Sequence, residues 1–197
     1  MTVAVIKVGV GNTASVMFAL ERLGTAAILT ADAVQVAEAE RIILPGVGAA
    51  AAAMRLLQGD LRDALIGFTR PLLGICLGQQ LFYDYSHEGN AAGLGLLGGE
   101  VTALEASPRL PTPHMGWSAL HVDRESALLE GVRSGDYAYF IHSYACPIDD
   151  ATVAVAEYGR AFSAAIAKKN IFGCQFHPER SGPVGARVLR NFLALPC

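Results

Sequence analysis

The feature that most constrains the fold is a cysteine framed by two glycines in the segment Pro71-Leu-Leu-Gly-Ile-Cys-Leu-Gly-Gln-Gln80. An apolar run, typical of a buried strand, ends at this Gly-x-Cys-x-Gly turn, and the pattern predicts a helix over residues 79–86. Gly74 and Gly78 lack a Cβ atom, which lets the chain turn sharply and hold the sulfur of Cys76 clear of the backbone. The first N–H groups of the predicted helix favour negative charge and are expected to lower the pKa of the thiol. This layout is that of a nucleophile elbow above a sheet edge.

Apolar runs and helical patterns alternate through the first half of the chain, which predicts βαβ units and a parallel sheet. The predicted strands cover residues 3–8, 26–30, 41–44 and 72–75, and the predicted helices cover residues 13–23 and 50–58. From about residue 98 the pieces become shorter and richer in β-forming residues, at 100–104, 117–122, 137–142, 152–157, 163–167 and 171–176, before a last helix over 183–195. We therefore expect an α/β fold in which helices flank a parallel sheet.

The composition excludes several classes of function. With 197 residues, of which 52% are hydrophobic, the chain suits one domain, residues 1–197, around a sheet buried on both faces. A net charge of −3 argues against nucleic-acid binding, no stretch is long enough to span a membrane, and the N-terminus lacks a secretion signal, so we expect a cytoplasmic protein. The cysteines lack a framework spacing, which favours reduced thiols, and no metal or cofactor is expected. Three of them are interpreted as small buried hydrophobes: Cys146, Cys174 and Cys197.

A second segment, Phe172-Gly-Cys-Gln-Phe-His-Pro-Glu179, supplies the partners that a cysteine nucleophile needs. A strand-like run ends at His177, and Glu179 lies two residues further on, on the same face of an extended chain. Pro178 biases His177 away from the helical region, so we expect the pair to be held extended. The sequence therefore predicts a triad of Cys76, His177 and Glu179.

These segments resemble the class I glutamine amidotransferases, whose two signature blocks are similar to Gly74-Ile-Cys-Leu-Gly-Gln-Gln80 and Gln175-Phe-His-Pro-Glu179. Further blocks narrow the resemblance to the glutaminase subunits of imidazole glycerol phosphate synthase, from histidine biosynthesis: Pro45-Gly-Val-Gly48, Pro113-His-Met-Gly-Trp117, Tyr139-Phe-Ile-His-Ser-Tyr144 and Gly11-Asn12. The resemblance runs from residue 3 to about residue 193. It implies the flavodoxin-like fold of this class, with a central, mostly parallel sheet and a small antiparallel β section, and the hydrolysis of glutamine to glutamate and ammonia.

The resemblance also implies roles for residues around the triad. The backbone N–H of Leu77, which follows the nucleophile, and an N–H of Val47 or Gly48 would form the oxyanion hole, with a peptide flip that the adjacent glycines permit. The glutamine substrate would be held by Gly46, Gln80, Ser143 and Tyr144. The plain alternative is that Gln80 is an ordinary polar residue of a first helical turn, and that Ser143 and Tyr144 are a strand end.

Ammonia must reach an acceptor, and 197 residues leave no room for a second catalytic domain. The resemblance implies a cyclase subunit, a (β/α)8 barrel, that forms a heterodimer with the glutaminase and yields imidazole glycerol phosphate and an aminoimidazole carboxamide ribotide. An aromatic residue with an arginine nearby is the usual composition of an interface hot spot. The implied contact residues are Pro113, His114, Met115, Trp117 and Arg180. The alternative is that Trp117 begins a core strand, and Ser118 stands where the family usually has asparagine.

Three other functions stay open. Gly9-Val-Gly-Asn-Thr-Ala14 after the first strand, with Asp32 about twenty residues further on, matches a dinucleotide-binding fingerprint. A stand-alone cysteine hydrolase, or a glutaminase-like module without an ammonia acceptor, would behave the same with or without any partner. Within the amidotransferases, the anthranilate or aminodeoxychorismate synthase type is the nearest competitor, and the block at residues 113–117 argues against it.

Overall fold

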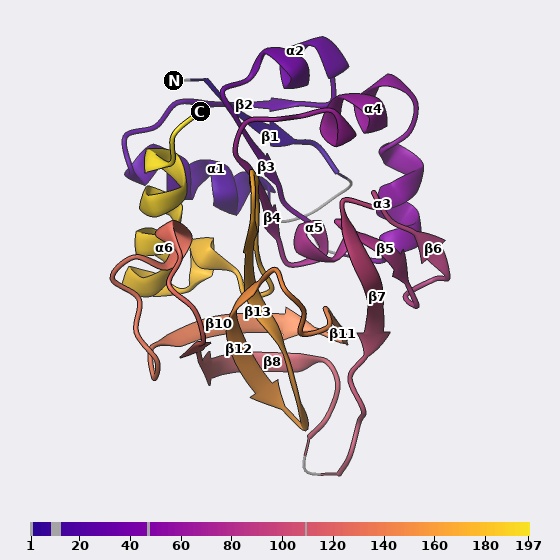
Figure 1. The fold of residues 1–197 in the computed structure, drawn as a ribbon, viewed down its shortest axis with the longest axis vertical. Coiled ribbons are helices and arrows are strands. Elements are labelled where there is room, and N and C mark those ends of the chain that lie inside the picture. The colour runs from indigo at the N-terminus through magenta and orange to yellow at the C-terminus, as the bar shows by residue number, and fades with distance from the viewer. Residues whose placement is uncertain (1, 9–12, 47, 109) are drawn as a thin grey trace.

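A computed structural model describes residues 2–8, 13–46, 48–108 and 110–197 of the chain. Eight of its strands form a central sheet (Figure 1). Within these residues, the sheet has the strand order β2-β1-β3-β4-β14-β13-β12-β9. Neighbours from β2 to β14 run parallel, and β13, β12 and β9 continue the sheet in antiparallel pairs. The strands are β1 (Val3–Ile6), β2 (Ala27–Thr30), β3 (Arg41–Leu44), β4 (Leu72–Ile75), β9 (His121–Val122), β12 (Thr152–Tyr158), β13 (Arg160–Lys168) and β14 (Ile171–Cys174).

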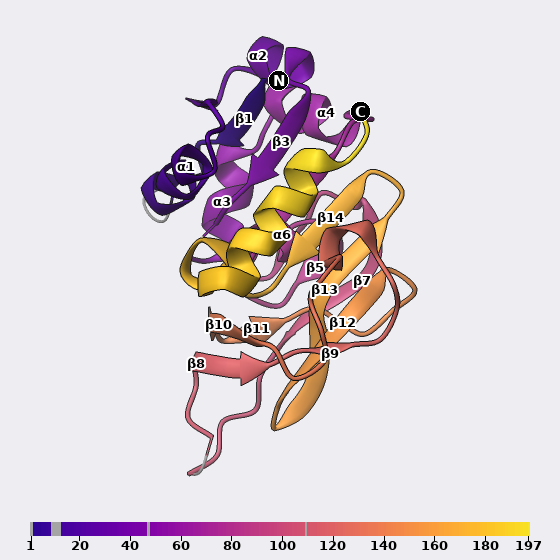
Figure 2. The same ribbon diagram turned by 90° about the vertical axis from the view of Figure 1, so that its left-hand side faces the viewer.

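Helices cover both faces of this sheet (Figures 1 and 2). On one face, Leu20 of α1 and Phe192 of α6 are fully buried, and on the other face Val36 of α2 and Leu65 of α4 are. Every residue of β1, β3 and β4 is buried, which explains why these strands are apolar runs apart from Arg41 at the start of β3. The helices are α1 (Thr13–Arg22), α2 (Ala33–Glu38), α3 (Ala50–Leu56), α4 (Asp60–Ile66), α5 (Leu77–Gln80) and α6 (Gly182–Ala194), with 3-10 turns at Ala127–Leu129 and Pro178–Arg180. In the described ranges, no helix has the length and apolar character needed to cross a membrane.

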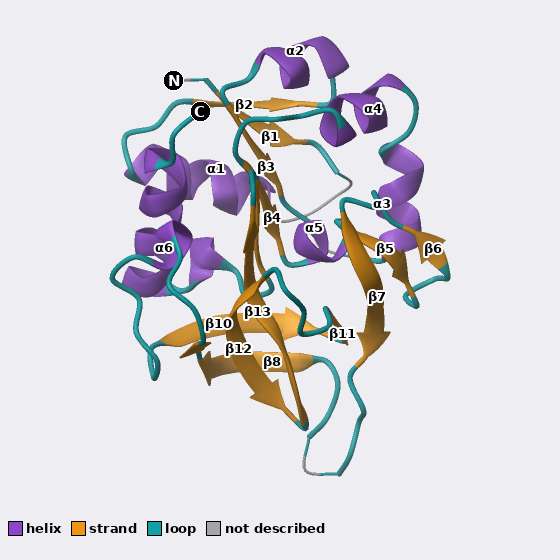
Figure 3. Cartoon of the chain, in the orientation of Figure 1, coloured by secondary structure: helices purple, strands orange, loops and turns teal. Residues whose placement is uncertain are grey.

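Two smaller sheets follow α5 along the chain (Figure 3). In the first, β8 (His114–Ala119) pairs antiparallel with β10 (Tyr137–His142). The second has the order β11-β7-β5-β6 and consists of β11 (Tyr144–Ala145), β7 (Leu97–Ala103), β5 (Tyr83–Ser86) and β6 (Ala91–Ala92). The backbone N–H of His177 donates to the carbonyl of Tyr139 at 2.9 Å. This bond ties the two-stranded sheet to the chain that leaves β14.

The α/β fold with a mostly parallel sheet and a small antiparallel section is confirmed, but one predicted element is wrong. The helix predicted over residues 79–86 ends at Gln80, and the chain then enters β5. Phe82 and Tyr83 are fully buried, and the N–H groups of Leu96 and Leu97 donate to the carbonyl of Phe82. Burial of two large rings therefore decides the local structure here, because tertiary packing overrides a local pattern. Sequence analysis does not predict α2, α4, β6 or β11, and it merges the end of β8 with β9 in one strand over residues 117–122.

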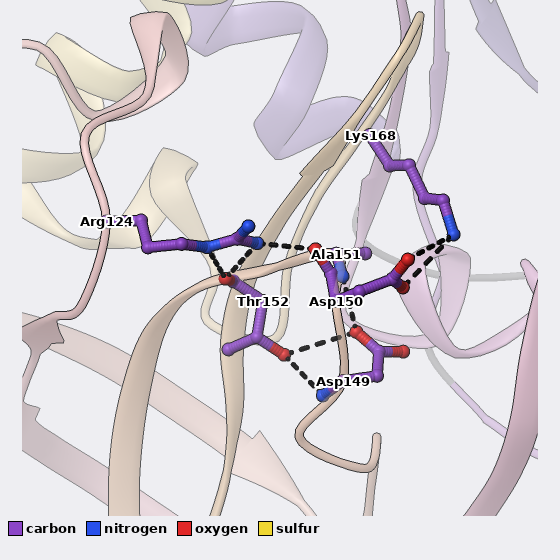
Figure 4. Close-up of polar contacts among 6 residues, drawn as sticks. All are labelled: Arg124, Asp149, Asp150, Ala151, Thr152 and Lys168. Atoms are coloured by element: carbon purple, nitrogen blue, oxygen red, sulfur yellow. Dashed lines mark hydrogen bonds and ion pairs between the residues drawn. The ribbon is translucent and has the colours of Figure 1, made fainter.

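Polar contacts fix the turn before β12 and connect it to the helix behind the glycine-framed cysteine. The guanidinium of Arg124 donates to the carbonyl of Thr152 at 2.9 and 2.6 Å, as Figure 4 shows. The Thr152 hydroxyl lies 3.3 Å from the Asp149 carboxylate and 3.0 Å from the hydroxyl of Ser163. The Ser163 carbonyl in turn accepts a hydrogen bond from Nε2 of Gln79 at 3.2 Å. The antiparallel end of the sheet is thereby joined to α5.

Candidate active site

Cys76 lies at the turn between β4 and α5. Its backbone has φ 53° and ψ −107°, so a residue with a side chain occupies a positive-φ conformation that favours glycine. A Cβ atom at residue 78 would lie 1.8 Å from the carbonyl oxygen of Leu44, and one at residue 74 would lie 2.5 Å from the backbone nitrogen of Gln79. Only glycine at both positions lets β4, α5 and β3 approach this closely. The turn thus has the shape that the glycine frame predicts, with Cys76 5% exposed.

His177 and Glu179 follow the end of β14. Nδ1 of His177 lies 2.8 Å from Oε1 of Glu179, and the two side chains are 1% and 0% exposed. The predicted extended geometry is wrong for part of this pair: His177 is extended, with φ −98° and ψ 97°, but Pro178–Arg180 forms a 3-10 turn. The hydroxyl of Ser181 donates to the His177 carbonyl at 2.7 Å and holds this turn. The two side chains therefore meet across a turn and not along one face of a strand.

The charge of His177 depends on its two neighbours in the predicted triad. Burial by itself lowers the pKa of a histidine, because it disfavours the charged imidazolium. Hydrogen bonds with the Cys76 sulfur and the Glu179 carboxylate, together with the charges of these groups, outweigh burial and raise the pKa of His177 to about 10. The imidazole is therefore protonated at neutral pH.

Two further groups contact the sulfur of Cys76. Sγ lies 3.7 Å from the carbonyl oxygen of Ile141 and accepts a hydrogen bond from Nε2 of Gln175 at 3.5 Å. Gln80 stands behind Gln175, because its Nε2 donates to Oε1 of Gln175 at 3.0 Å and to the carbonyl of Tyr144 at 2.7 Å. Gln175 has no role in the sequence-based prediction, although it stands in the second signature block. Its position in that block is the one signal that points to it.

A cleft of about 330 Å³ opens at Cys76. It is lined by Gly48, Ala49, Cys76, Leu77, Gln80, Glu88, Pro113, Ile141, His142, Ser143 and Tyr144. The structure thus brings together most of the residues predicted to hold the oxyanion or the glutamine. Gly46 is absent from this lining and packs behind Leu77, where an added Cβ atom would lie 2.8 Å from that side chain. Val47 lies outside the described residues.

Glu88 is an acidic residue of the cleft that sequence reasoning missed. Its carboxylate accepts a hydrogen bond from the backbone N–H of Ala50 at 3.1 Å. Burial raises the pKa of Glu88 above its ordinary value, while the bond from Ala50 acts in the opposite direction. Glu88 reaches the cleft because the chain runs through β5 after α5. The predicted helix over residues 79–86 would give the chain another path at this point, so Glu88 could not be predicted to line the cleft.

The predicted partner-contact block forms the start of β8, and its side chains divide between two faces of the strand. Met115 and Trp117 are 60% and 54% exposed, and Pro113 and Arg180 are exposed as well. The strand predicted over residues 117–122 begins earlier, at His114, and Trp117 lies on its exposed side, so the interpretation of Trp117 as the start of a core strand is wrong. His114 is 2% exposed. The alternation along β8 turns it inward, which contradicts its predicted place at the contact.

Asp32, the acidic residue of the dinucleotide-binding fingerprint, is engaged at the start of a helix. The carboxylate of Asp32 accepts a hydrogen bond from the N–H of Val34 at 2.8 Å and caps α2. The glycines of that fingerprint, and the Gly11-Asn12 pair of the resemblance, fall in residues 9–12, outside the described residues. Among the residues that the structure describes, no cluster of three or more His, Cys, Asp or Glu side chains could hold a metal ion. Asp32 therefore has a structural role at a helix start.

Comparison with known proteins identifies the class. Residues 4–195 match the family described as glutamine amidotransferase class-I. A solved glutamine amidotransferase shares the fold with a TM-score of 0.74 at 20% identity, over 97% of this chain and 96% of the other. PurLQS from Thermotoga maritima has a TM-score of 0.69 at 21% identity, over 98% of this chain and 97% of the other. The chain belongs to the class-I glutamine amidotransferases and is an enzyme.

More similar relatives narrow the family. The imidazole glycerol phosphate synthase subunit HisH 2 of Legionella pneumophila (strain Paris) is 46% identical, over 98% of each chain. The HisH subunits of Xylella fastidiosa and Idiomarina loihiensis are 47% and 46% identical, over 98% and 99% of this chain and 97% and 98% of their own. Within its class, the chain belongs to this HisH family, and the predicted resemblance is confirmed. The relatives are named as subunits, which implies a partner subunit.

Proposed function

We propose that residues 1–197 form a single-domain glutaminase subunit of imidazole glycerol phosphate synthase, which hydrolyses glutamine to glutamate and ammonia in histidine biosynthesis. One observation carries the proposal: Cys76 lies at a cleft, and the buried pair of His177 and Glu179 is hydrogen-bonded behind it. Membership of the HisH family supports both the substrate and the pathway.

In the first half-reaction, the Cys76 thiolate attacks the side-chain carboxamide carbon of glutamine. The tetrahedral adduct collapses as its C–N bond breaks, and protonated His177 gives its proton to the departing nitrogen, which leaves as ammonia. A pKa of about 10 suits this step, because the imidazole holds its proton in the resting enzyme. The product is a thioester on Cys76, with His177 neutral.

In the second half-reaction, neutral His177 takes a proton from water, and the resulting hydroxide attacks the thioester carbon. The C–S bond breaks, which releases the γ-carboxylic acid of glutamate and restores the Cys76 thiolate, with the imidazolium of His177 already re-formed. The carboxylic acid then loses its proton to solvent, and glutamate leaves. Glu179 keeps Nδ1 of His177 occupied at 2.8 Å, so Nε2 is the ring atom that exchanges protons with the reacting groups. Cys76, His177 and Glu179 therefore act as nucleophile, acid–base and orienting group.

The oxyanion and the substrate need donors at the cleft. The backbone N–H of Leu77, the residue after the nucleophile, donates one hydrogen bond to the oxyanion. The second donor is the N–H of Val47 or Gly48, and Gly48 has a φ of 100°, which favours glycine. Gln80, Ser143 and Tyr144 line the cleft where the amino-acid part of glutamine would bind, with Gly46 supporting Leu77 from behind.

Glu88 adds a specific element to substrate binding. Glutamine carries an α-ammonium group, and Glu88 is the acidic side chain among the residues that line the cleft. A partly buried carboxylate attracts an ammonium more strongly than an exposed one, because solvent screens it less. We assign Glu88 the role of holding the α-ammonium group.

The exposed face of the two-stranded sheet suits the partner. Trp117 of β8 lies opposite Tyr139 of β10, with ring centroids 6.0 Å apart, and Met115 and Tyr137 are 60% and 57% exposed. The guanidinium of Arg180 lies 4.8 Å from the centre of the Tyr139 ring. Exposed aromatic residues with an arginine mark interaction sites. We assign this face to the cyclase subunit, a (β/α)8 barrel that forms a cytoplasmic heterodimer with this chain.

The test is ammonia release from glutamine by the purified chain, alone and with the cyclase subunit and its nucleotide ligand. We expect strong activation by the liganded partner, and loss of turnover with retention of the fold in Cys76→Ala. Cys197→Ala, at an exposed cysteine outside the cleft, is the matched control and should keep full turnover. Activity that ignores the partner would favour a stand-alone hydrolase, and unchanged turnover of Cys76→Ala would exclude the mechanism.

A further inference from the structure

Two buried histidines beside the cleft have no role in the mechanism above. His114 of β8 and His142 of β10 stand opposite each other, with exposures of 2% and 6%. Nδ1 of His114 lies 3.1 Å from Nε2 of His142. The rings of Phe140 and Tyr158 stack on His114, with centroid distances of 5.0 and 4.1 Å. Polar ring atoms in such surroundings need hydrogen-bond partners within the protein.

The partners fix the position of each ring proton. A carbonyl oxygen only accepts, so Nδ1 of His142, 2.8 Å from the Tyr144 carbonyl, carries a proton and donates it. A neutral imidazole has one N–H, so Nε2 of His142 accepts, and Nδ1 of His114 donates to it. Nε2 of His114 then accepts from the hydroxyl of Ser118 at 2.9 Å. The bonds run in one direction, from Ser118 through both rings to Tyr144.

This arrangement requires that both rings are neutral. Burial lowers the pKa of His114 to about 4. Burial also lowers the pKa of His142 to about 3. Burial outweighs the opposing effect of the hydrogen bond to the Tyr144 carbonyl, and the charges of His114, His177 and Arg160 act in the same direction as burial. Protonation of either ring would remove an acceptor that the next donor uses. The geometry and the burial therefore agree on one protonation state.

The hydrogen bonds from Ser118 through both rings end at the Tyr144 carbonyl, which also accepts a hydrogen bond from Gln80 of the cleft. The Tyr144 carbonyl accepts from His142 at 2.8 Å and from Nε2 of Gln80 at 2.7 Å. The same amide group of Gln80 bonds to Gln175, which donates to the Cys76 sulfur. A carbonyl with two donors has one preferred orientation, and that orientation sets the position of Gln80.

We infer that His114 and His142 are positioning residues for the glutaminase reaction, which hold the Tyr144 carbonyl, and through it Gln80, in the orientation that glutamine binding requires. This inference rests on the proposed function. The pair lies on the buried face of the two-stranded sheet, and the exposed face of the same sheet is assigned to the partner. Side-chain hydrogen bonds therefore connect β8 to the cleft.

The first test uses the unmodified chain and needs no activity. Nitrogen-15 NMR of the histidine rings distinguishes the Nδ1–H tautomer, the Nε2–H tautomer and the imidazolium. We expect both His114 and His142 to be neutral Nδ1–H tautomers throughout pH 6 to 8. Observation of an Nε2–H tautomer or an imidazolium at either residue in this range overturns the inference.

The second test separates positioning from packing. His142→Asn keeps an N–H donor near the position of Nδ1, whereas His142→Leu has similar size and no donor. In complex with the cyclase subunit, we expect His142→Leu to raise KM for glutamine on the order of tenfold, the effect of one lost hydrogen bond. We expect kcat to change by less than about threefold and His142→Asn to restore most of the loss in KM.

Equal KM values for the two variants would overturn the inference, because a role in packing alone affects both alike. If His142→Leu does not fold, the NMR result decides. If the wild-type complex does not hydrolyse glutamine, the proposed function fails, and the tautomers are still determined by NMR.

Discussion

Substitution of Gly78 by alanine tests how the turn positions Cys76. The added Cβ atom would lie 1.8 Å from the Leu44 carbonyl oxygen, which is 1.2 Å short of the 3.0 Å that real Cβ atoms respect. The neighbour is backbone of β3, so it cannot rotate away as a side chain would. We expect a cost of about 3 kcal/mol, the upper end of the usual range for overpacking. For a chain of this length, that lowers Tm by roughly 6 to 12 °C.

The same substitution should disable catalysis in the molecules that still fold. A separation of α5 from β3 by about 1 Å moves the turn that holds Cys76, and a misplacement of that size costs on the order of a hundredfold in rate. Thermal unfolding and ammonia release with the liganded partner measure the two effects. Gly98→Ala is the control, because its Cβ atom would meet Asp84 at an ordinary 3.7 Å. If Gly78→Ala unfolds within about 2 °C of wild type and keeps its turnover, the close approach of α5 to β3 is not what positions the sulfur.

Three further substitutions test the proposed site. Glu179→Gln should lower the pKa of His177. Because that pKa is raised from 6.5 to about 10, its contribution to stability is full below pH 6.5 and is lost as the pH rises toward 10. Urea unfolding should therefore show a stability gap between wild type and variant that narrows over this window, and a constant gap would contradict the pairing. Glu88→Gln should raise KM for glutamine on the order of tenfold and leave kcat nearly unchanged, and an unaltered KM would exclude its contact with the α-ammonium group. Trp117→Ala should weaken binding of the cyclase subunit by about 2 kcal/mol in calorimetry, with little change in Tm, whereas a large loss of Tm with full affinity would assign the side chain to folding.

The elbow and the triad could be predicted from sequence because their signals are local. Two glycines at fixed spacing determine how closely α5 approaches β3, and a histidine two residues before a glutamate needs only one turn to meet it. The turn type still differs from the prediction, since a 3-10 turn and an extended pair share the same sequence spacing.

The remaining errors arise where distant segments decide the structure. Burial of Phe82 and Tyr83 ends α5 early, and this change brings Glu88 to the cleft. Gln175 contacts residues about 100 positions away in sequence, so no local pattern shows its partners. His114 faces inward because β8 begins three residues before the predicted strand, which places it on the buried side of the alternation.

The position of β14 has a consequence for the assembly of the enzyme. This strand lies between β4 and β13, yet it follows β4 by about 100 residues. Until it inserts, β4 presents an unpaired edge, which is a site for aggregation, and Cys76 lacks the histidine that β14 leads into. Contacts of such long sequence separation form slowly. During synthesis, Cys76 is therefore made well before His177. Insertion of β14 between β4 and β13 then completes the sheet and brings the histidine to the cysteine in the same step. A misfolded chain that leaves β14 out would release no ammonia.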